Sequence, residues 1–305
     1  QGPTPAPLAR MARMFPRPKT PMGEAWFMAE QRRMFSVLLG ELETVSDQEI
    51  TKALTEIASG PTCFGPIDEW SEWYHHLLPR LIERAWDRSR FHPAELLITA
   101  FMTQHPDMDG TLSYPEFRID ALQTLGSYIM SRPFWYRNGI PGCLNKWPGP
   151  NGIYGWYRAD GLISASLFFC MKYLEPGEVE SWFRSALAIP NPYWRAQMIA
   201  WLIGAYPMLV GEIEQPSQFP ELGPFDISWN WSHAIGGNYT GNFVEPVQRI
   251  PFLPAENSEI ALRATHDWDL GDFFEELATN PGLTAIAAET AGMEECFGDL
   301  YRRAK

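Results

Sequence analysis

The sequence predicts an all-α protein made mainly of helical hairpins, arranged as an α-α superhelix or an α/α-toroid, with two long irregular aromatic-rich loops. Two observations predict this fold class. Apolar residues recur at helical spacing through most of the chain, and short turns separate neighbouring segments, as in antiparallel helix pairs. Strand patterns are weak, because only residues near 225–250 fit a short hairpin.

Helical periodicity indicates the individual helices in order. Ser46 and Glu49 form a capping-box pattern that should start one helix, and Pro79 should kink the helix that contains it. The most apolar stretch, residues 193–211, also contains Arg, Gln and Pro, so we expect a buried helix and not a membrane span. The predicted helices lie within residues 23–45, 46–60, 66–89, 93–104, 114–131, 159–174, 176–189, 191–209, 270–280 and 284–304.

Composition and proline content suggest the domain organisation. The chain has 305 residues, 45% of them hydrophobic, so it can bury a sizeable core. Residues 1–21 contain six prolines and four basic residues but no acidic residue. Because proline resists helix and sheet, we expect an extended basic arm there, packed on its own domain or on a partner. Residues 22–305 should form one helical domain, or two lobes, 22–132 and 159–305, joined by loop 133–158.

The predicted helix pairs resemble α-solenoids of the HEAT type. The stretch LLPRLIERAWDRSRFHPAELLITAFM, residues 77–102, carries the resemblance, with Pro79 inside its first helix. No period is repeated three times, and the Asp and Arg positions typical of those repeats are absent. The resemblance implies a stacked helical surface that binds another protein.

The stretch HPDMDGTLSYPEF, residues 105–117, resembles a single EF-hand calcium loop. It departs at the first position, where His105 replaces the usual Asp and removes an oxygen ligand. A helix–turn–helix corner, with Ser113 capping the second helix, explains the same residues without a metal. We expect this corner, with weak calcium binding as the alternative and no other cofactor. The ligands that the resemblance implies are Asp107, Asp109, Thr111 and Glu116.

His75 and His76 are adjacent, and neighbours on a helix point about 100° apart. They do not form a facing pair of metal ligands. We expect one imidazole at the edge of the core and the other in solvent.

Two long irregular segments, residues 133–158 and 211–255, interrupt the helices. Loops of this length are usually functional or mark an inserted module. Asp160 and Asp226 stand beside their aromatic residues, where a glycan hydrolase would need a general acid and a general base. In the other interpretation, the aromatic side chains only fasten the loops to the core. The candidate ligand or partner surface comprises Trp147, Trp156, Tyr157, Trp229, Trp231 and Tyr239.

The formal net charge of −13 disfavours binding to nucleic acid and to anionic membranes, which need clustered Lys and Arg. It favours a basic protein as partner. The four cysteines are scattered without a C-x-x-C pair, which favours reduced thiols and a cytoplasmic location.

These observations favour a non-enzymatic helical protein of adaptor or toxin-neutralising type, which binds a partner through an acidic or aromatic surface. The alternative is an α/α-toroid enzyme that acts on glycans or small molecules, with its cleft under loops 133–158 and 211–255. A third hypothesis is a binding protein that calcium modulates weakly.

Overall fold

The computed structural model of the chain contains two compact units. One unit combines Gln1–Ser131 with Trp231–Arg249, and the other combines Arg132–Asn230 with Ile250–Lys305. The fold class is all-α, as the helical periodicity predicts. The structure describes residues 4–22, 35–59, 67–88, 93–108, 113–128, 159–219, 227–235 and 251–302, without 285, 286, 288, 289 and 291.

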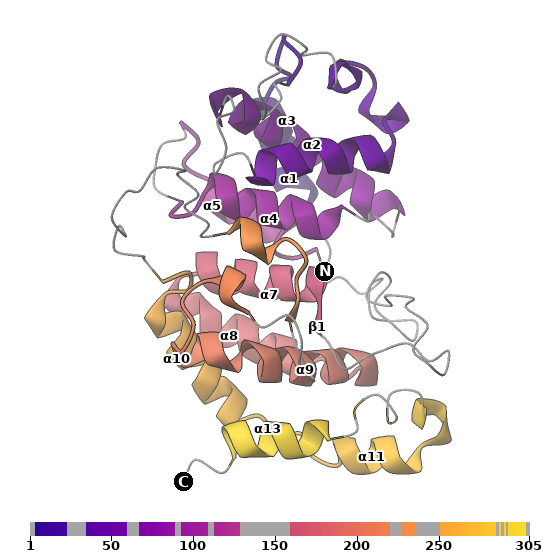
Figure 1. Ribbon diagram of the computed structural model, residues 1–305, viewed down its shortest axis with the longest axis vertical. Coiled ribbons are helices and arrows are strands. Elements are labelled where there is room, and N and C mark those ends of the chain that lie inside the picture. The colour runs from indigo at the N-terminus through magenta and orange to yellow at the C-terminus, as the bar shows by residue number, and fades with distance from the viewer. Residues whose placement is uncertain are drawn as a thin grey trace. The chain divides into compact units, whose positions relative to one another are not determined.

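The first unit is a set of packed helices (Figure 1). Its elements are α1 (Pro5–Met14), η1 (Ser36–Leu39), η2 (Leu42–Thr44), α2 (Asp47–Ser59), α3 (Ile67–Arg88), α4 (Ala94–Gln104), α5 (Phe117–Thr124) and η5 (Ser232–Ala234), where η marks a 3₁₀ turn. Helix α2 packs along α4, α3 contacts both, and α1 lies on α3 and α5. Helices that adjoin in sequence therefore share one core.

Helix α3 presents the apolar face that the sequence predicts. Its large apolar side chains recur three and four residues apart, so that they form one stripe along the helix, and His75 and His76 are buried beside it. Full burial of each large apolar side chain contributes about 1.5–3 kcal/mol. The residues of the stripe are Trp70, Trp73, Tyr74, Leu77, Leu78, Leu81 and Ile82.

The predicted extended arm is wrong over Pro5–Met14, which forms α1. Pro5 and Pro7 stand in the first turn, where amide protons have no partner within the helix and proline costs little. Residues 8–14 are Leu, Ala, Arg and Met, which are strong helix formers. Pro16 follows only after the helix ends. The number of prolines in residues 1–21 was therefore misleading, because none of them lies in the interior of α1.

The predicted helix over residues 23–45 is wrong in its described part. Residues 35–45 form the short turns η1 and η2, and residues 23–34 lie outside the described residues. Gly40, between the two turns, has extended backbone angles (φ −82°, ψ −163°). Glycine loses much freedom in a helix, so a break at this position costs less than at its neighbours.

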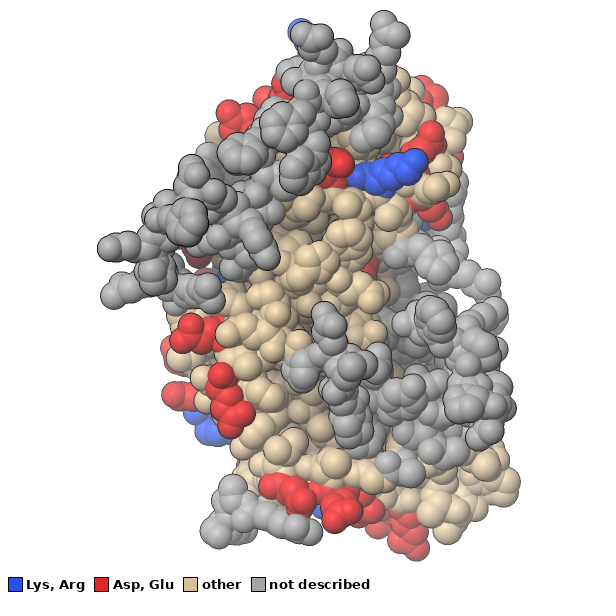
Figure 2. Space-filling view, in the orientation of Figure 1, with Lys and Arg blue, Asp and Glu red and all other residues tan. Residues whose placement is uncertain are grey.

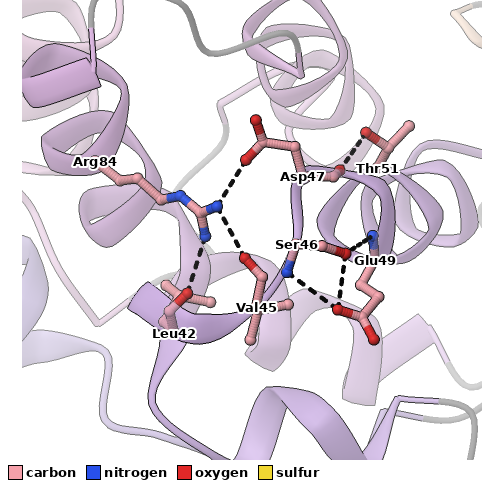
Figure 3. Close-up of polar contacts among 7 residues, drawn as sticks. All are labelled: Leu42, Val45, Ser46, Asp47, Glu49, Thr51 and Arg84. Carbon is pink, nitrogen blue, oxygen red and sulfur yellow. Dashed lines mark hydrogen bonds and ion pairs between the residues drawn. The ribbon is translucent and has the colours of Figure 1, made fainter.

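The start of α2 is fixed by side chains from two parts of the chain (Figure 3). Ser46 and Glu49 form the predicted capping box. The Ser46 amide donates to Glu49 Oε2 over 3.0 Å, and the Glu49 amide donates to Ser46 Oγ over 3.2 Å. Arg84 of α3 donates to the Val45 carbonyl over 2.8 Å and pairs with Asp47 at 2.6 Å. One guanidinium thus ties α3 to the turn before α2.

The second unit is also helical. Its elements are β1 (Ala159–Asp160), α7 (Gly161–Tyr173), α8 (Pro176–Leu187), α9 (Pro192–Leu209), η4 (Pro216–Gln218), β2 (Ile227–Ser228), α10 (Ala255–His266), α11 (Phe273–Thr279), η6 (Pro281–Leu283) and α13 (Met293–Tyr301). Helix α9 is the predicted buried helix, and it packs against α10 and α13. Among the described residues, no helix combines the length and apolar character needed to cross a membrane.

Helix α10 is missing from the sequence-based prediction. Its core-facing side is built largely from small or polar residues, among them Asn257, Ser258 and Thr265, which are all buried. The Asn257 amide donates to the Met171 carbonyl over 2.7 Å and to the Leu174 carbonyl over 3.0 Å. These bonds satisfy carbonyl groups at the end of α7. An apolar pattern cannot reveal a helix that packs through hydrogen bonds.

The two short strands pair in parallel, Ala159 with Ile227 and Asp160 with Ser228. This pairing differs from the predicted hairpin near residues 225–250, whose last part, 236–250, lies outside the described residues. Each strand adjoins one of the two long irregular segments. The strand pairing therefore places Ile227 and Ser228, which lie within the second segment, beside the two residues that follow the first segment.

Candidate functional site

Trp229 of the predicted aromatic surface lies in the core of the second unit. Its side chain is only 4% exposed. The indole stacks on Phe168 of α7, with ring centroids 5.7 Å apart, and meets Phe252 edge-on at 6.3 Å. Trp229 thus fastens the segment after β2 to the helical core, and little of its indole is open to a partner.

Trp231 is the more accessible of the two tryptophans, and it belongs to the first unit. It is half-buried, and its ring centroid lies 5.6 Å from that of the exposed His233. The η5 turn that follows it contacts α4. Trp231 therefore remains a candidate for partner contact. Trp147, Trp156, Tyr157 and Tyr239 lie outside the described residues.

The candidate catalytic carboxylates are placed only through their backbone. Asp160 ends β1, and its main chain is paired with Ser228. The side chain of Asp160 and the whole of Asp226 lie outside the described residues. The acid–base pair stays a prediction.

The EF-hand-like stretch runs between α4 and α5. Asp107 is exposed, and Glu116 is exposed at the residue before α5, with no side-chain bond to the helix end. Asp109 and Thr111 lie outside the described residues. Ser113 does not cap the helix, because α5 begins at Phe117 and not at Tyr114. Among the described residues, no three His, Cys, Asp or Glu side chains are grouped so that they could hold a metal ion.

His105, the first residue of that stretch, turns inward to a second histidine. Its Nε2 lies 2.9 Å from Nε2 of His75, so one imidazole donates a hydrogen bond and the other accepts it. The two rings are 7% and 9% exposed for His75 and His105. Phe15 stacks on His75, with ring centroids 4.6 Å apart. We name this group the histidine–aromatic cluster: Phe15, His75, Phe101, His105, Tyr114 and Phe117.

The expectation that one of His75 and His76 faces solvent is wrong, because His76 is also buried, at 3% exposed. It lies beside the end of α1, where its Nδ1 is 3.4 Å from the Phe15 carbonyl oxygen. The Arg80 guanidinium reaches the same carbonyl over 3.4 Å. Helix α1, absent from the sequence-based prediction, is what covers this histidine.

Burial holds the three imidazoles in their neutral forms. Desolvation lowers the pKa of His75 to about 4. Desolvation, with the charge of Arg80 and Arg17, lowers the pKa of His76 to about 4. Desolvation, with the neighbouring His75, lowers the pKa of His105 to about 3. Strongly shifted groups gathered in one place mark a candidate functional site.

A buried carboxylate adjoins the cluster. Asp120 of α5 is 0% exposed and accepts a hydrogen bond from Arg10 Nε of α1 over 3.0 Å. It also accepts from the Tyr114 hydroxyl. Burial and the hydrogen bond to Asp120 raise the pKa of Tyr114 to about 12. The network attaches the N-terminal helix to α5 through a charge-assisted pair.

A surface of the second unit carries a strong excess of negative charge. Across the described part of residues 251–302, the exposed carboxylates outnumber the exposed cations of that range, Arg263 and Arg302, and Arg184 of α8 pairs with one of them, Asp267. Figure 2 shows acidic side chains along the edge where Figure 1 places α11 and α13. This acidic surface comprises Glu256, Glu259, Asp267, Asp269, Asp272, Glu275, Glu276, Glu294, Glu295 and Asp299.

Comparisons with known proteins do not assign the chain to a family. Protein families, curated proteins and solved structures were each searched with this chain, and none of the three searches gives a match.

Proposed function

We propose that the chain is a non-enzymatic, protein-binding helical module of adaptor or toxin-neutralising type, and that it binds a basic protein through its acidic surface. The excess of exposed carboxylates over α10, α11 and α13 carries this proposal. Complementary charge accelerates encounter and selects among partners. Trp231 offers a second, aromatic contact in the other unit.

A stacked helical arrangement of the HEAT type is part of the proposal. Helices two apart in sequence order pack on each other, α1 with α3, α2 with α4, and α8 with α10. Stacked helical hairpins have contacts of this kind, and such stacks commonly present extended binding surfaces. A cytoplasmic location also belongs to the proposal, and the free thiol of Cys296 supports it.

The test is capture of partners from a lysate of the source cells, followed by a charge-matched comparison. The chain serves as bait at about 50 and about 500 mM NaCl, because salt screens exposed charges. We expect one dominant partner rich in Lys and Arg, whose retention falls at high salt. The triple variant Glu259→Gln, Glu276→Gln, Glu295→Gln removes one charge from each of the three helices and should lose the partner.

The matched control removes three exposed charges from the first unit: Glu41→Gln, Glu43→Gln, Glu72→Gln. It should retain the partner as the wild type does. Equal retention by both triple variants would remove the acidic surface from the proposal. A Trp231→Ala variant separates the two predicted surfaces, since loss of the partner in that variant alone would assign binding to the aromatic residue.

A further inference from the structure

Residues 4–22, which we name the N-terminal strap, are fastened to the first unit along their whole length. Near its start, Arg10 pairs with the buried Asp120. Near its end, Trp73 Nε1 of α3 donates to the Thr20 carbonyl over 3.1 Å. The last residue of the strap, Met22, is completely buried. The strap is thus held in the folded unit by specific contacts near both of its ends.

The centre of the strap rests on two neighbouring histidines. The ring of Phe15 stacks on His75 with centroids 4.6 Å apart, and the Phe15 carbonyl lies 3.4 Å from His76 Nδ1. Arg80 donates to the carbonyl groups of Ala12 over 3.3 Å and Phe15 over 3.4 Å, where it satisfies the end of α1. The Phe15 ring therefore contacts one imidazole, that of His75, and the Phe15 carbonyl group contacts the other, that of His76.

The two charged side chains that act on His76 are both positive. A proton on His76 would bring a third positive charge to Arg80 and Arg17, both of which already act on this imidazole. A proton on His75 would place a charge between Phe15 and His105, with little access to water. The titratable and charged groups near them include Arg10 and Arg17 of the strap, Tyr74, Arg80 and Glu83 of α3, His105 after α4, and Tyr114 and Asp120, before and within α5.

We propose that the N-terminal strap is an acid-releasable element: neutral His75 and His76 hold it in place, and their protonation frees it from α3 and α5. Lifting Phe15 gives both imidazolium groups access to water and separates His76 from Arg17. The core beneath loses the edge contact of Phe117 with Phe15 but keeps ring contacts of its own, Tyr74 with Phe101 and Phe101 with Phe117. Release is therefore local, and it uncovers the histidine–aromatic cluster.

Hydrogen exchange read by mass spectrometry tests the proposal on the full chain. Protection of residues 4–22 is compared with that of α2, α4 and α9 at several pH values from 7.5 to 4, after correction for the intrinsic exchange rate. We expect protection of the strap to fall by about tenfold per pH unit for each proton taken up, while α2, α4 and α9 stay protected. Loss of protection in all of them together would mean acid unfolding and would overturn the proposal.

Two variants make the result specific. In His75→Phe/His76→Gln the strap should stay protected at acid pH, because neither side chain takes up a proton there. The matched control is His266→Gln, which removes an exposed imidazole of the second unit and should release its strap as the wild type does. A double variant that releases the strap normally would overturn the proposal.

If circular dichroism shows that the double variant is unfolded at pH 7, the single variant His76→Gln takes its place. Its strap should be released at a lower pH than the wild-type strap, because one of the two protons is no longer taken up. Release of the strap at the same pH as in the wild type would overturn the proposal.

Discussion

At the scale of single residues, the histidine–aromatic cluster shows what a sequence can and cannot predict. The EF-hand resemblance led to His105 only as a departure from the calcium pattern. The structure gives this histidine a role of its own, because its imidazole bonds His75 inside the protein. The two residues are thirty positions apart, and no local spacing predicts that they meet. Asp120 and Arg10 escaped prediction for the same reason.

The buried imidazoles should make stability depend on pH. Their folded pKa values, about 4 for His75 and about 3 for His105, lie below the unfolded value of 6.5. Between these values the unfolded chain binds more protons, so stability is complete above about pH 6.5 and falls as the pH drops towards 4. Each proton of difference contributes about 1.4 kcal/mol per pH unit.

Urea unfolding from pH 7.5 to 4.5 measures this slope. His75→Phe should flatten it by about one proton, whereas His233→Gln, which changes an exposed imidazole of the same unit, should not. An unchanged slope in His75→Phe would assign the acid sensitivity to other groups.

Asp120→Ala should destabilise the first unit. The substitution leaves the buried Tyr114 hydroxyl without its acceptor, which costs about 1–3 kcal/mol. Urea unfolding at pH 7 gives the free energy, and Glu116→Ala, an exposed carboxylate nearby in sequence, is the comparison. Equal stabilities of the two variants would show that the network contributes nothing measurable.

At the scale of elements, two predictions hold where residues close in sequence decide the structure. The stripe of α3 and the capping box of α2 were predictable, because both depend on residues within one turn or two of each other. Helices α1 and α10 were not. The first was hidden by prolines that fall in its first turn, and the second packs through buried polar groups such as Asn257. The predicted aromatic surface is not borne out at Trp229, because this side chain packs on α7 in the core.

Arg84→Lys tests how much the turn before α2 depends on one side chain. The guanidinium bonds the Leu42 and Val45 carbonyl groups and Asp47 together, and a single ammonium group cannot reproduce that fork. We expect a loss of about 1–3 kcal/mol in urea unfolding and faster hydrogen exchange in α2. Arg184→Lys, whose guanidinium lies exposed between Glu180 and Asp267, is the control and should cost much less. Equal losses would mean that burial of Arg84 adds nothing.

At the scale of the whole molecule, each of the two units has its own buried core, and the chain passes between them more than once. Sequence periodicity cannot locate such a division, since the η5 turn, Ser232–Ala234, contacts α4 from a distant part of the chain. Units with separate cores can unfold separately unless their interface couples them. Paired core substitutions, one in each unit, therefore measure the coupling.

Leu54→Ala removes a fully buried side chain from α2, and such truncations cost about 2–5 kcal/mol. Asn257→Ala removes the two bonds that α10 makes to the end of α7, at about 1–3 kcal/mol. If the units unfold independently, calorimetry should show two transitions, and each variant should lower a different one. Hydrogen exchange should agree, with α4 affected by the first variant and α7 by the second. A single transition that both variants lower would instead mean that the two cores unfold as one cooperative unit.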